Sequence, residues 1–282
     1  MQVFKSGTEW QKSWLQALKT NKTIGFVPTM GALHKGHLEL IRASKKSTDL
    51  TVVSIFVNPI QFTNQEDFEK YPVLTSQDLE LLQKEKVDFV FLPSQESIYP
   101  EKPILNFNFG NLERVLEGEF RPGHFSGVGI IVSKLFNIIR PNIAFFGQKD
   151  LQQVAIIKKV VQDLSFPLKL HIVPTIREKD GLALSSRNMR LSVQEREKAL
   201  ILYNSLEFAK NELLTNKDWL AVRKQMMLSF EAEPLAKLEY FELVHPETFQ
   251  VFEEFERGKK SSICVASFIG NIRLIDNLPI IP

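Results

Sequence analysis

Segments of two kinds alternate along the first two thirds of the chain. Short apolar runs rich in β-branched residues are typical of buried strands, and longer segments with apolar residues three or four positions apart predict helices. The expected strands are residues 24–28, 50–57, 87–92, 143–146 and 168–173, and the expected helices are residues 36–47, 75–86, 126–140 and 151–164. Strands that alternate with helices pair in parallel through right-handed crossovers, so the pattern predicts an α/β fold with a Rossmann-like, doubly wound parallel sheet over residues 1–175.

The pattern changes in the last third of the chain, where long helical segments precede consecutive strands. The expected helices are residues 192–214 and 219–231, and the expected strands are residues 238–244, 262–268 and 271–275. Because Ile269 and Gly270 alone separate the last two strands, we expect a hairpin with a tight turn there. Residues 176–282 are therefore predicted to form a smaller C-terminal α+β domain.

Charge and cysteine content narrow the class of protein. The 282 residues include 35 Lys and Arg against 33 Asp and Glu, a formal net charge of +2, which argues against nucleic acid or a membrane surface as a partner. The single cysteine, Cys264, excludes an intrachain disulfide framework, and its apolar neighbours predict that it is buried. With no apolar stretch of ~20 residues and no signal-peptide pattern at the start, we expect a cytoplasmic protein.

The segment that follows the first predicted strand is the first candidate for chemistry. Residues 28–37 read Pro-Thr-Met-Gly-Ala-Leu-His-Lys-Gly-His and lead into a helix, whose N-terminus attracts anions. Gly31 and Gly36 have the outer glycine spacing of a P-loop, but His37 and Leu38 stand where the lysine and the hydroxyl residue belong. The G-x-G-x-x-G fingerprint is absent as well. Both observations argue against a P-loop NTPase and a dinucleotide-binding loop.

His34 and His37 are the candidate catalytic side chains of that segment. Two imidazoles beside a helix N-terminus can hydrogen-bond phosphate oxygens and can donate a proton where charge develops. Two polar residues at a surface turn, or two metal ligands, are the alternatives. Two of the five histidines of the chain fall at the expected ligand end of the sheet, which favours a function. We expect no third metal ligand beside the two histidines, which disfavours metal ligation.

Three further loops follow predicted strands and carry amide or anion-binding groups. Asn58 and Gln61 follow the strand at 50–57, and the sequence Gly-Gln-Lys-Asp at 147–150 follows the strand at 143–146. The loop 180–188 carries two serines and Arg187, a combination suited to a polyphosphate. Each loop alone is also compatible with an ordinary polar turn. Four such loops at the carboxyl ends of parallel strands favour a nucleotide-sized site.

These motifs resemble a known family. Residues 28–37 are similar to the nucleotide-binding motif of the nucleotidyltransferase and class I aminoacyl-tRNA synthetase superfamily. The wider set resembles the pantothenate synthetase (pantoate–β-alanine ligase) family and spans nearly the whole chain, at residues 28–37, 56–62, 121–125, 146–150, 180–188 and 273–277. The resemblance implies that ATP, pantoate and β-alanine are converted through a pantoyl adenylate to pantothenate, AMP and pyrophosphate.

The resemblance also implies roles for individual residues. His37 corresponds to the proton donor, and we expect catalytic roles for His34 and Lys149 at the phosphates. Gln61 and Gln153 correspond to amides that contact pantoate, Gln61 also contacting β-alanine, and Asn58 is expected in the same pocket. The residues expected to bind ATP are Met30, Gly31, Ala32, Leu33, His34, Lys35, Gly36, His37, Gly147, Gln148, Lys149, Asp150, Ile176, Leu184, Ser185, Ser186 and Arg187.

Two positions depart from the family pattern. Gln77 precedes Asp78 where many members have paired acidic residues, and Gln148 stands where glutamate is common. The resemblance implies Mg²⁺ together with ATP, with Asp78 as the one candidate protein ligand. It also implies a homodimer. Because the loop 185–188 lies at the predicted domain junction, we expect the C-terminal part to act as a lid over the ATP phosphates.

Two other functions compete with the ligase interpretation. A related nucleotidyltransferase would move AMP or CMP onto a phosphate ester, but the amides of Gln61 and Gln153 suit an uncharged hydroxyl and a carboxylate better than a phosphate. A non-catalytic nucleotide-binding or nucleic-acid-binding module is the second alternative, and the absence of a basic stripe argues against the nucleic acid.

Overall fold

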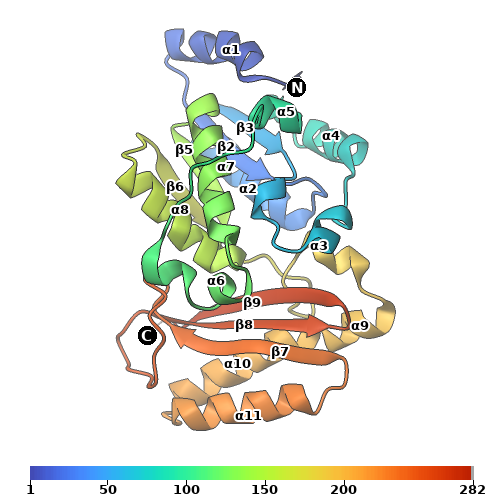
Figure 1. Cartoon of the computed structure of the whole chain (residues 1–282), viewed down its shortest axis with the longest axis vertical. Helices are drawn as coiled ribbons and strands as arrows, with labels where there is room; N and C mark the ends of the chain where they lie inside the picture. Colours follow the sequence, from blue (N-terminus) through green and yellow to red (C-terminus); the bar gives the residue numbers. More distant parts are fainter. Residues whose placement is uncertain (281–282) are drawn as a thin grey trace.

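The computed structural model describes residues 1–280, and its first part is built on a sheet of six parallel strands (Figure 1). The strand order is β1-β4-β3-β2-β5-β6. The strands are β1 (Gln2–Phe4), β2 (Ile24–Thr29), β3 (Leu50–Ile55), β4 (Phe89–Phe91), β5 (Ile143–Gly147) and β6 (Lys169–Val173). The predicted doubly wound parallel sheet is therefore confirmed, with β1 as an edge strand that the sequence pattern missed because it has only three residues.

Helices cover both faces of this sheet, as the near-continuous apolar strands require. One face packs against α1 (Gly7–Lys19), α7 (His124–Ile139) and α8 (Leu151–Asp163), and the other packs against α2 (Lys35–Ser47) and α4 (Thr75–Lys84). Neighbouring strand residues alternate between the two cores. Phe26 lies in the first and Val27 in the second, and both are fully buried.

Short helical turns connect the larger elements. They are η1 (Pro59–Gln61), α3 (Gln65–Glu69), α5 (Gln95–Ile98), η2 (Gly110–Glu113), α6 (Glu117–Phe120), η3 (Gln148–Asp150) and η4 (Ser186–Arg190).

The C-terminal part has the α+β composition that its sequence predicts. It contains α9 (Val193–Lys198), α10 (Leu200–Leu214), α11 (Trp219–Glu231) and an antiparallel sheet of β7 (Ala236–Val244), β8 (Ser261–Ile269) and β9 (Ile272–Ile280). One face of this sheet packs on α10 and α11, and the other lies toward the first part of the chain (Figure 1). Cys264, on that second face, packs near Leu116 and Ala155 and is buried as expected.

Two predicted elements differ from the structure. The segment 192–214, expected to be one helix, forms two helices that meet at the buried Ala199. The sequence did not predict this break, because the apolar spacing continues through the junction. The strand expected to end at residue 275 continues to Ile280, although Asn277 and Pro279 are unfavourable in strands. β9 is the edge of its sheet, where a proline without an N–H is tolerated.

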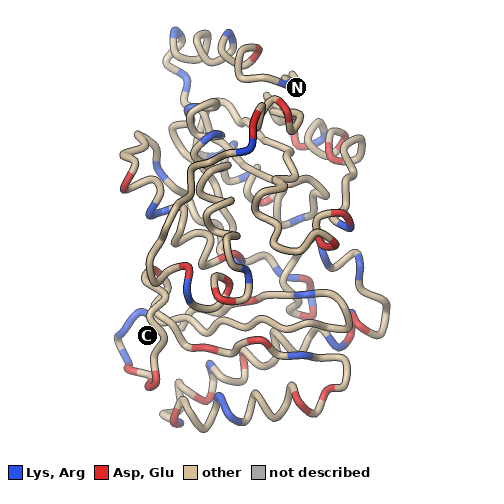
Figure 2. The backbone as a smooth tube through the Cα atoms, in the orientation of Figure 1, with Lys and Arg blue, Asp and Glu red and all other residues tan. Residues whose placement is uncertain are grey.

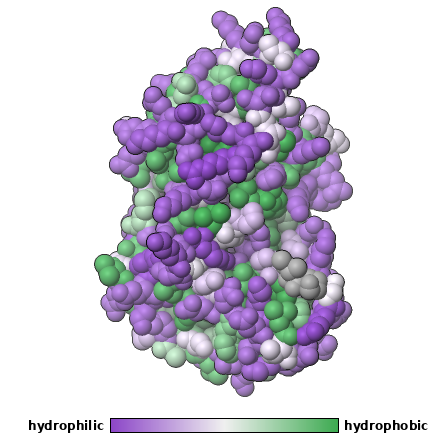
Figure 3. Space-filling model, turned by 180° about the vertical axis from the view of Figure 1, so that it is seen from behind, coloured by the Kyte–Doolittle hydropathy of each residue, from purple (hydrophilic) through white to green (hydrophobic). Residues whose placement is uncertain are grey.

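Charges are dispersed over both parts of the molecule. Figure 2 shows acidic and basic residues interspersed along the chain, and Figure 3 shows hydrophilic side chains over most of the rear face with smaller hydrophobic groups between them. Across residues 1–280, none of the helices has the length and apolar character needed to cross a lipid bilayer.

Candidate active site

A cleft lies at the carboxyl edge of the parallel sheet, where the strand order reverses between β2 and β5. Ligands of doubly wound folds bind at this topological position. Its volume of about 250 Å³ exceeds what a few ordered waters need, so it can hold a ligand. The predicted residues that line it are Met30, His34, Gly36, His37, Asn58, Gln61, Gly147, Lys149, Asp150, Gln153, Ile176, Leu184, Ser185, Ser186 and Arg187.

The other residues predicted to bind ATP do not line the cleft. Gly31, Ala32 and Leu33 form the turn that leads to the histidines, and the side chain of Lys35 is exposed. Gln148 does not line the cleft, although its backbone belongs to the turn that carries Lys149.

A buried carboxylate holds the turn after β2. Asp78, at 1% exposure in α4, accepts hydrogen bonds from the N–H groups of Ala32 and Leu33, each at 2.8 Å. Gly31 has a φ of +81°, and a Cβ there would approach Asp78 Oδ2 to 2.9 Å, so glycine is required on both counts. The turn is thereby fixed from within the first part of the chain.

The two histidines begin α2 as a reciprocal cap. His34 Nδ1 accepts from the Gly36 N–H at 3.1 Å, and His37 Nδ1 accepts from the His34 N–H at 3.3 Å. Their ring centroids are 4.0 Å apart. A Cβ on Gly36 would approach the His34 ring to 2.9 Å, so the ring position depends on that glycine. This hydrogen-bond pattern assigns the proton of each neutral ring to Nε2, which leaves Nε2–H as a free donor.

The surroundings of the two rings disfavour their protonation. Burial, the neighbouring His37 and the Lys149 ammonium lower the pKa of His34 to about 3. Burial and Lys149 lower the pKa of His37 to about 4. Both rings are therefore neutral at pH 7. Imidazole N–H groups and one ammonium thus share the cleft, a set of donors suited to an anion.

Asn58 orients the amide of Gln61 rather than projecting freely into the cleft. At 1% exposure, Asn58 donates from Nδ2 to Gln61 Oε1 at 3.0 Å and accepts from Tyr99 Oη at 2.8 Å. This leaves the amide nitrogen of Gln61 against Met30 Sδ at 2.8 Å. Gln153 lines the cleft from α8, so the two predicted substrate amides lie in the same cavity.

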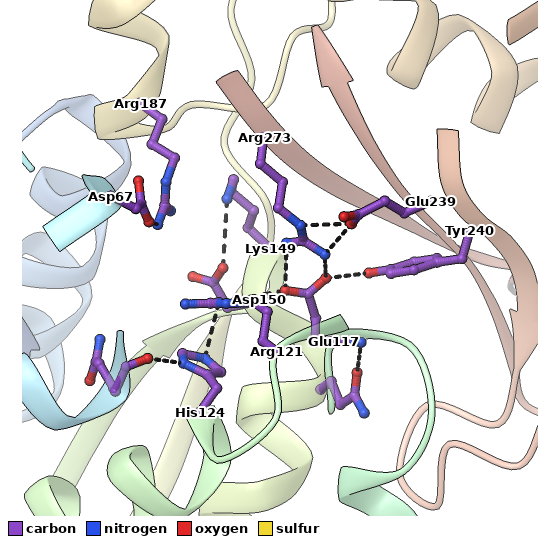
Figure 4. Close-up of polar contacts among 12 residues, drawn as sticks. Asp67, Glu117, Arg121, His124, Lys149, Asp150, Arg187, Glu239, Tyr240 and Arg273 are labelled. Carbon is purple, nitrogen blue, oxygen red and sulfur yellow. Dashed lines mark hydrogen bonds and ion pairs between the residues drawn. The ribbon is translucent and has the colours of Figure 1, made fainter. Parts of the chain in front are cut away.

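The loop before α9 approaches the histidine turn from the C-terminal side. The Ser186 hydroxyl donates to the Ala32 carbonyl at 3.0 Å and joins the two loops. Asp67 of α3 accepts from Arg187 at 2.7 Å (Figure 4). It also accepts from Arg190 at 3.0 Å. These contacts bring the predicted arginine to the cleft and bind it to a carboxylate that sequence reasoning did not single out.

Three further residues, Arg121, His124 and Tyr71, line the cleft, and the sequence analysis assigned no role to them. His124 Nδ1 bonds to the Gln61 carbonyl at 2.7 Å, and its Nε2 lies 3.2 Å from the Arg121 guanidinium. Tyr71 of the segment after α3 also lines the cleft. Arg121 and His124 lie in the Arg-Pro-Gly-His segment 121–124, which matched a family motif. Nothing in the sequence indicated that Tyr71 lines the cleft.

A buried ionic cluster joins the C-terminal sheet to α6 (Figure 4). Arg273 of β9 bonds to both oxygens of Glu117 at 2.8 and 2.7 Å, and Tyr240 donates to Glu117 at 2.8 Å. Burial alone would raise the pKa of Glu117, but Arg273, Arg121 and Tyr240 outweigh it and lower that pKa to about 2. The cluster closes the cleft on the side of the C-terminal sheet.

The described residues do not form a protein cage for a divalent metal. Residues 1–280 contain no group of three or more His, Cys, Asp or Glu side chains in a metal-binding arrangement. Both oxygens of Asp78, the candidate magnesium ligand, are bonded to backbone N–H groups, so this carboxylate does not fit the role in this conformation.

Comparison with known proteins gives concordant matches over the whole chain. A family model described as Pantoate-beta-alanine ligase matches residues 2–279. A pantothenate synthetase from Thermoanaerobacter sp. (strain X514) is 50% identical over 260 residues, covering 92% of this chain and 91% of that protein. A pantothenate synthetase from Sulfurihydrogenibium sp. (strain YO3AOP1) is 45% identical over 281 residues, covering 99% of each.

Solved structures agree with these matches. Pantothenate synthetase from Thermus thermophilus superposes with a TM-score of 0.92 over 100% of both chains, at 38% identity. Pantoate-beta-alanine ligase from Francisella tularensis, complexed with Beta-gamma ATP and Beta-alanine, superposes with a TM-score of 0.81 over 99% of this chain and 97% of that one, at 36% identity. The family resemblance and the fold expected from the sequence are therefore confirmed.

Proposed function

Because this chain belongs to the pantoate-beta-alanine ligase family and is an enzyme of the ligase class, we propose that it condenses (R)-pantoate with β-alanine and consumes ATP. The observation that carries the proposal is the cleft itself. It combines two neutral imidazoles and a lysine with two amides, at the carboxyl edge of the sheet. The first group suits a triphosphate, and the amides suit a substrate with a hydroxyl and a carboxylate.

In the first proposed step, a carboxylate oxygen of pantoate attacks the α-phosphorus of ATP. A new P–O bond forms, the bond to the bridging oxygen breaks, and pyrophosphate leaves with the electron pair. The products are pantoyl adenylate and pyrophosphate. Gln61 and Gln153 hold pantoate beside the nucleotide, which makes the attack effectively intramolecular.

The loop that carries His34 and His37, together with Lys149, stabilises the phosphate charges in that step. The Nε2–H groups of His34 and His37 donate to phosphate oxygens, and Lys149 balances the developing charge. A bound triphosphate raises the pKa of a nearby imidazole, because opposite charge favours the protonated ring. His37 then has a proton to donate to the leaving pyrophosphate, in keeping with the role that the family motif implies.

In the second proposed step, the amine of β-alanine attacks the carbonyl carbon of the adenylate. The C–N bond forms, the C–O bond to AMP breaks, and the amine proton is lost to solvent. Pantothenate and AMP are the products. We expect Mg²⁺ to accompany ATP as its counter-ion, and we assign it no protein ligand and no step.

Pyrophosphate release before the second substrate is added tests the adenylate route. Protein, ATP and pantoate without β-alanine should release about one equivalent of pyrophosphate per active site. Later addition of β-alanine should release AMP. Pyrophosphate that appears only after β-alanine is added would exclude an adenylate that forms before β-alanine binds. No pyrophosphate under either condition would contradict the proposed ligase activity. A phosphate ester in place of pantoate tests the nucleotidyltransferase alternative and should release none.

We also propose that residues 1–175 and 176–282 act as two domains, with the second closing over the ATP phosphates, and that two chains form a homodimer. The Arg187 and Asp67 contact between these parts supports closure, since it joins them beside the cleft that Arg187 lines. A smaller radius of gyration with ATP and pantoate would support closure, and identical profiles would count against it. Sedimentation equilibrium tests the dimer.

A further inference from the structure

Asn277 of β9 lies where the C-terminal sheet meets the turn that carries Lys149. Its side-chain Nδ2 donates to the carbonyl of Gln148 at 3.1 Å and to the carbonyl of Lys149 at 2.8 Å. Asn277 is 3% exposed and lines the cleft. One amide group from the far end of the chain therefore uses both of its N–H bonds on two successive carbonyls of a single turn.

The turn in question has little local support. The 3-10 turn Gln148–Asp150 has no side chain that caps its N-terminus, and a Cβ added to Gly147 before it would meet no atom within 4 Å. The Lys149 ammonium lies 3.6 Å from Asp150, its sequence neighbour. Since the position of a lysine head group follows the backbone that carries it, the two bonds from Asn277 help to determine where the ammonium points.

Asn277 is itself held by a buried ion pair. Asp276 accepts the N–H of Asn277 at 2.7 Å, and Arg177 donates to both oxygens of Asp276 at 2.5 and 2.9 Å. Arg177 also donates to the Asn277 carbonyl at 3.1 Å. The Asp276 side chain is 2% exposed and the Arg177 side chain is 16% exposed, so solvent screens this pair weakly. A charge-assisted contact thus fixes the strand end from which Asn277 projects.

The same arginine reaches the loop that precedes Arg187. Arg177 donates to the Gly181 carbonyl at 3.1 Å and forms a bridge with Ala183, which directly precedes Leu184. It also lies over the Tyr203 ring, 4.7 Å from the ring centroid. Arg177, Asp276 and Asn277 therefore connect the two loops on either side of the proposed ATP phosphates.

We propose that Asn277 is a positioning residue for Lys149, held in place by Asp276 and Arg177. It acts through the carbonyls of residues 148 and 149 and touches no reacting atom. The inference rests on the proposed function, because the role of Lys149 belongs to that proposal. Displacement of a catalytic group by about 1 Å can cost roughly 100-fold in rate, so loss of these two bonds should slow the phosphoryl step.

The test compares Asn277→Ala with Asn271→Ala, which removes the same residue type from the exposed turn between β8 and β9. Pantoate-dependent pyrophosphate release is measured in single turnover, and ATP binding is measured by calorimetry. Asn277→Ala should release pyrophosphate roughly 10- to 100-fold more slowly, with its Kd for ATP within about threefold of wild type. Asn271→Ala should match wild type in both. Asn277→Ser, which keeps one donor, should recover part of the rate and serves where the alanine variant does not fold.

The rate of a Lys149→Ala enzyme, with and without Asn277→Ala, distinguishes a positioning role of Asn277 from a merely structural one. If Asn277 acts through Lys149, then Asn277→Ala should slow a Lys149→Ala enzyme by less than about twofold. An equal proportional loss in both backgrounds, or a wild-type rate for Asn277→Ala, overturns the proposal. If the wild-type protein itself releases no pyrophosphate, it is the proposed function that fails.

Discussion

The two loops that meet at the cleft are held in opposite ways. The turn after β2 is fixed by Asp78, a fully buried carboxylate with two 2.8 Å bonds to backbone N–H groups of the same part of the chain. Besides the bond from Ser186 to the Ala32 carbonyl, the loop before α9 is held by Asp67, whose side chain is 27% exposed and whose partners Arg187 and Arg190 are 23% and 22% exposed. α3, which carries Asp67, has no buried residue.

The turn after β2, called the fixed loop below, is therefore preorganised. The loop before α9, called the releasable loop, is held by contacts that break more easily. Buried hydrogen bonds between a carboxylate and backbone groups hold their geometry and are screened weakly by salt. Ion pairs near the surface contribute little and weaken with salt. Under the proposed function, rings that polarise phosphate gain most from fixed positions, whereas a loop that admits ATP gains from a contact that breaks easily. The first loop should thus tolerate change poorly and the second should tolerate it well.

Removal of a ring from the fixed loop should have the largest effect. His37→Ala is expected to lower kcat by roughly 10²- to 10⁴-fold, the range for a general acid or base, while Kd for ATP changes far less. Steady-state kinetics and calorimetry measure the two quantities. Glu39→Gln, an exposed change on the same helix, is the control and should match wild type. A His37→Ala enzyme with wild-type turnover would assign the ring a structural role.

Removal of the anchor should cost stability rather than chemistry alone. Asp78→Asn retains one acceptor and turns an N–H group toward another N–H group, so the free energy of unfolding should fall by about 1–3 kcal/mol. Urea denaturation at low and high salt measures it, and the loss should be the same at both. Glu80→Gln on the exposed side of α4 is the control. No loss of stability would show that the turn is held by other contacts.

The fixed loop could be predicted from sequence to a large extent, because its parts are neighbours in the chain. Gly31, His34, Gly36 and His37 lie within seven residues at the end of a recognisable strand. The role of Asp78 could not be predicted in this way. It was singled out as a candidate metal ligand, and its bonds to backbone groups 45 and 46 positions away depend on how α4 packs.

The releasable loop and the cleft walls depend on still longer separations. Asp67 and Arg187 are 120 positions apart, and Glu117 and Arg273 are 156 apart. A single sequence carries no signal that joins such residues, because hydrophobic periodicity reports burial and not which elements meet. Asn277 illustrates the limit, since it lies in a tail that matched the family pattern, yet its contact with the Lys149 turn exists only in the folded chain.

Acidification should weaken the fixed loop. Neighbours and burial lower the pKa of His34 to about 3 and that of His37 to about 4, below the ordinary 6.5, so the unfolded chain binds more protons at intermediate pH. The stability contributed by the neutral rings is complete above pH 6.5 and is lost progressively as the pH falls toward 4. Between pH 7 and pH 5, wild type should lose on the order of 1 kcal/mol more than His37→Ala, by urea denaturation. Equal slopes for wild type and His37→Ala would contradict the assignment.

The smallest effect is expected at the releasable loop. Asp67→Asn should lower the free energy of unfolding by only about 0–1 kcal/mol, because the ion pairs with Arg187 and Arg190 are partly exposed. The difference in the free energy of unfolding between Asp67→Asn and wild type should be smaller in 0.5 M NaCl than at low salt. Salt screens the ion pairs of Asp67 in the wild type, and the variant lacks these pairs. Glu66→Gln, which removes the more exposed pair with Lys70 at the end of the same helix, is the control, and its effect should be smaller still. A loss of several kcal/mol that persists in salt would mean that Asp67 anchors its loop as firmly as Asp78 anchors the other, and the contrast between a fixed and a releasable loop would be wrong.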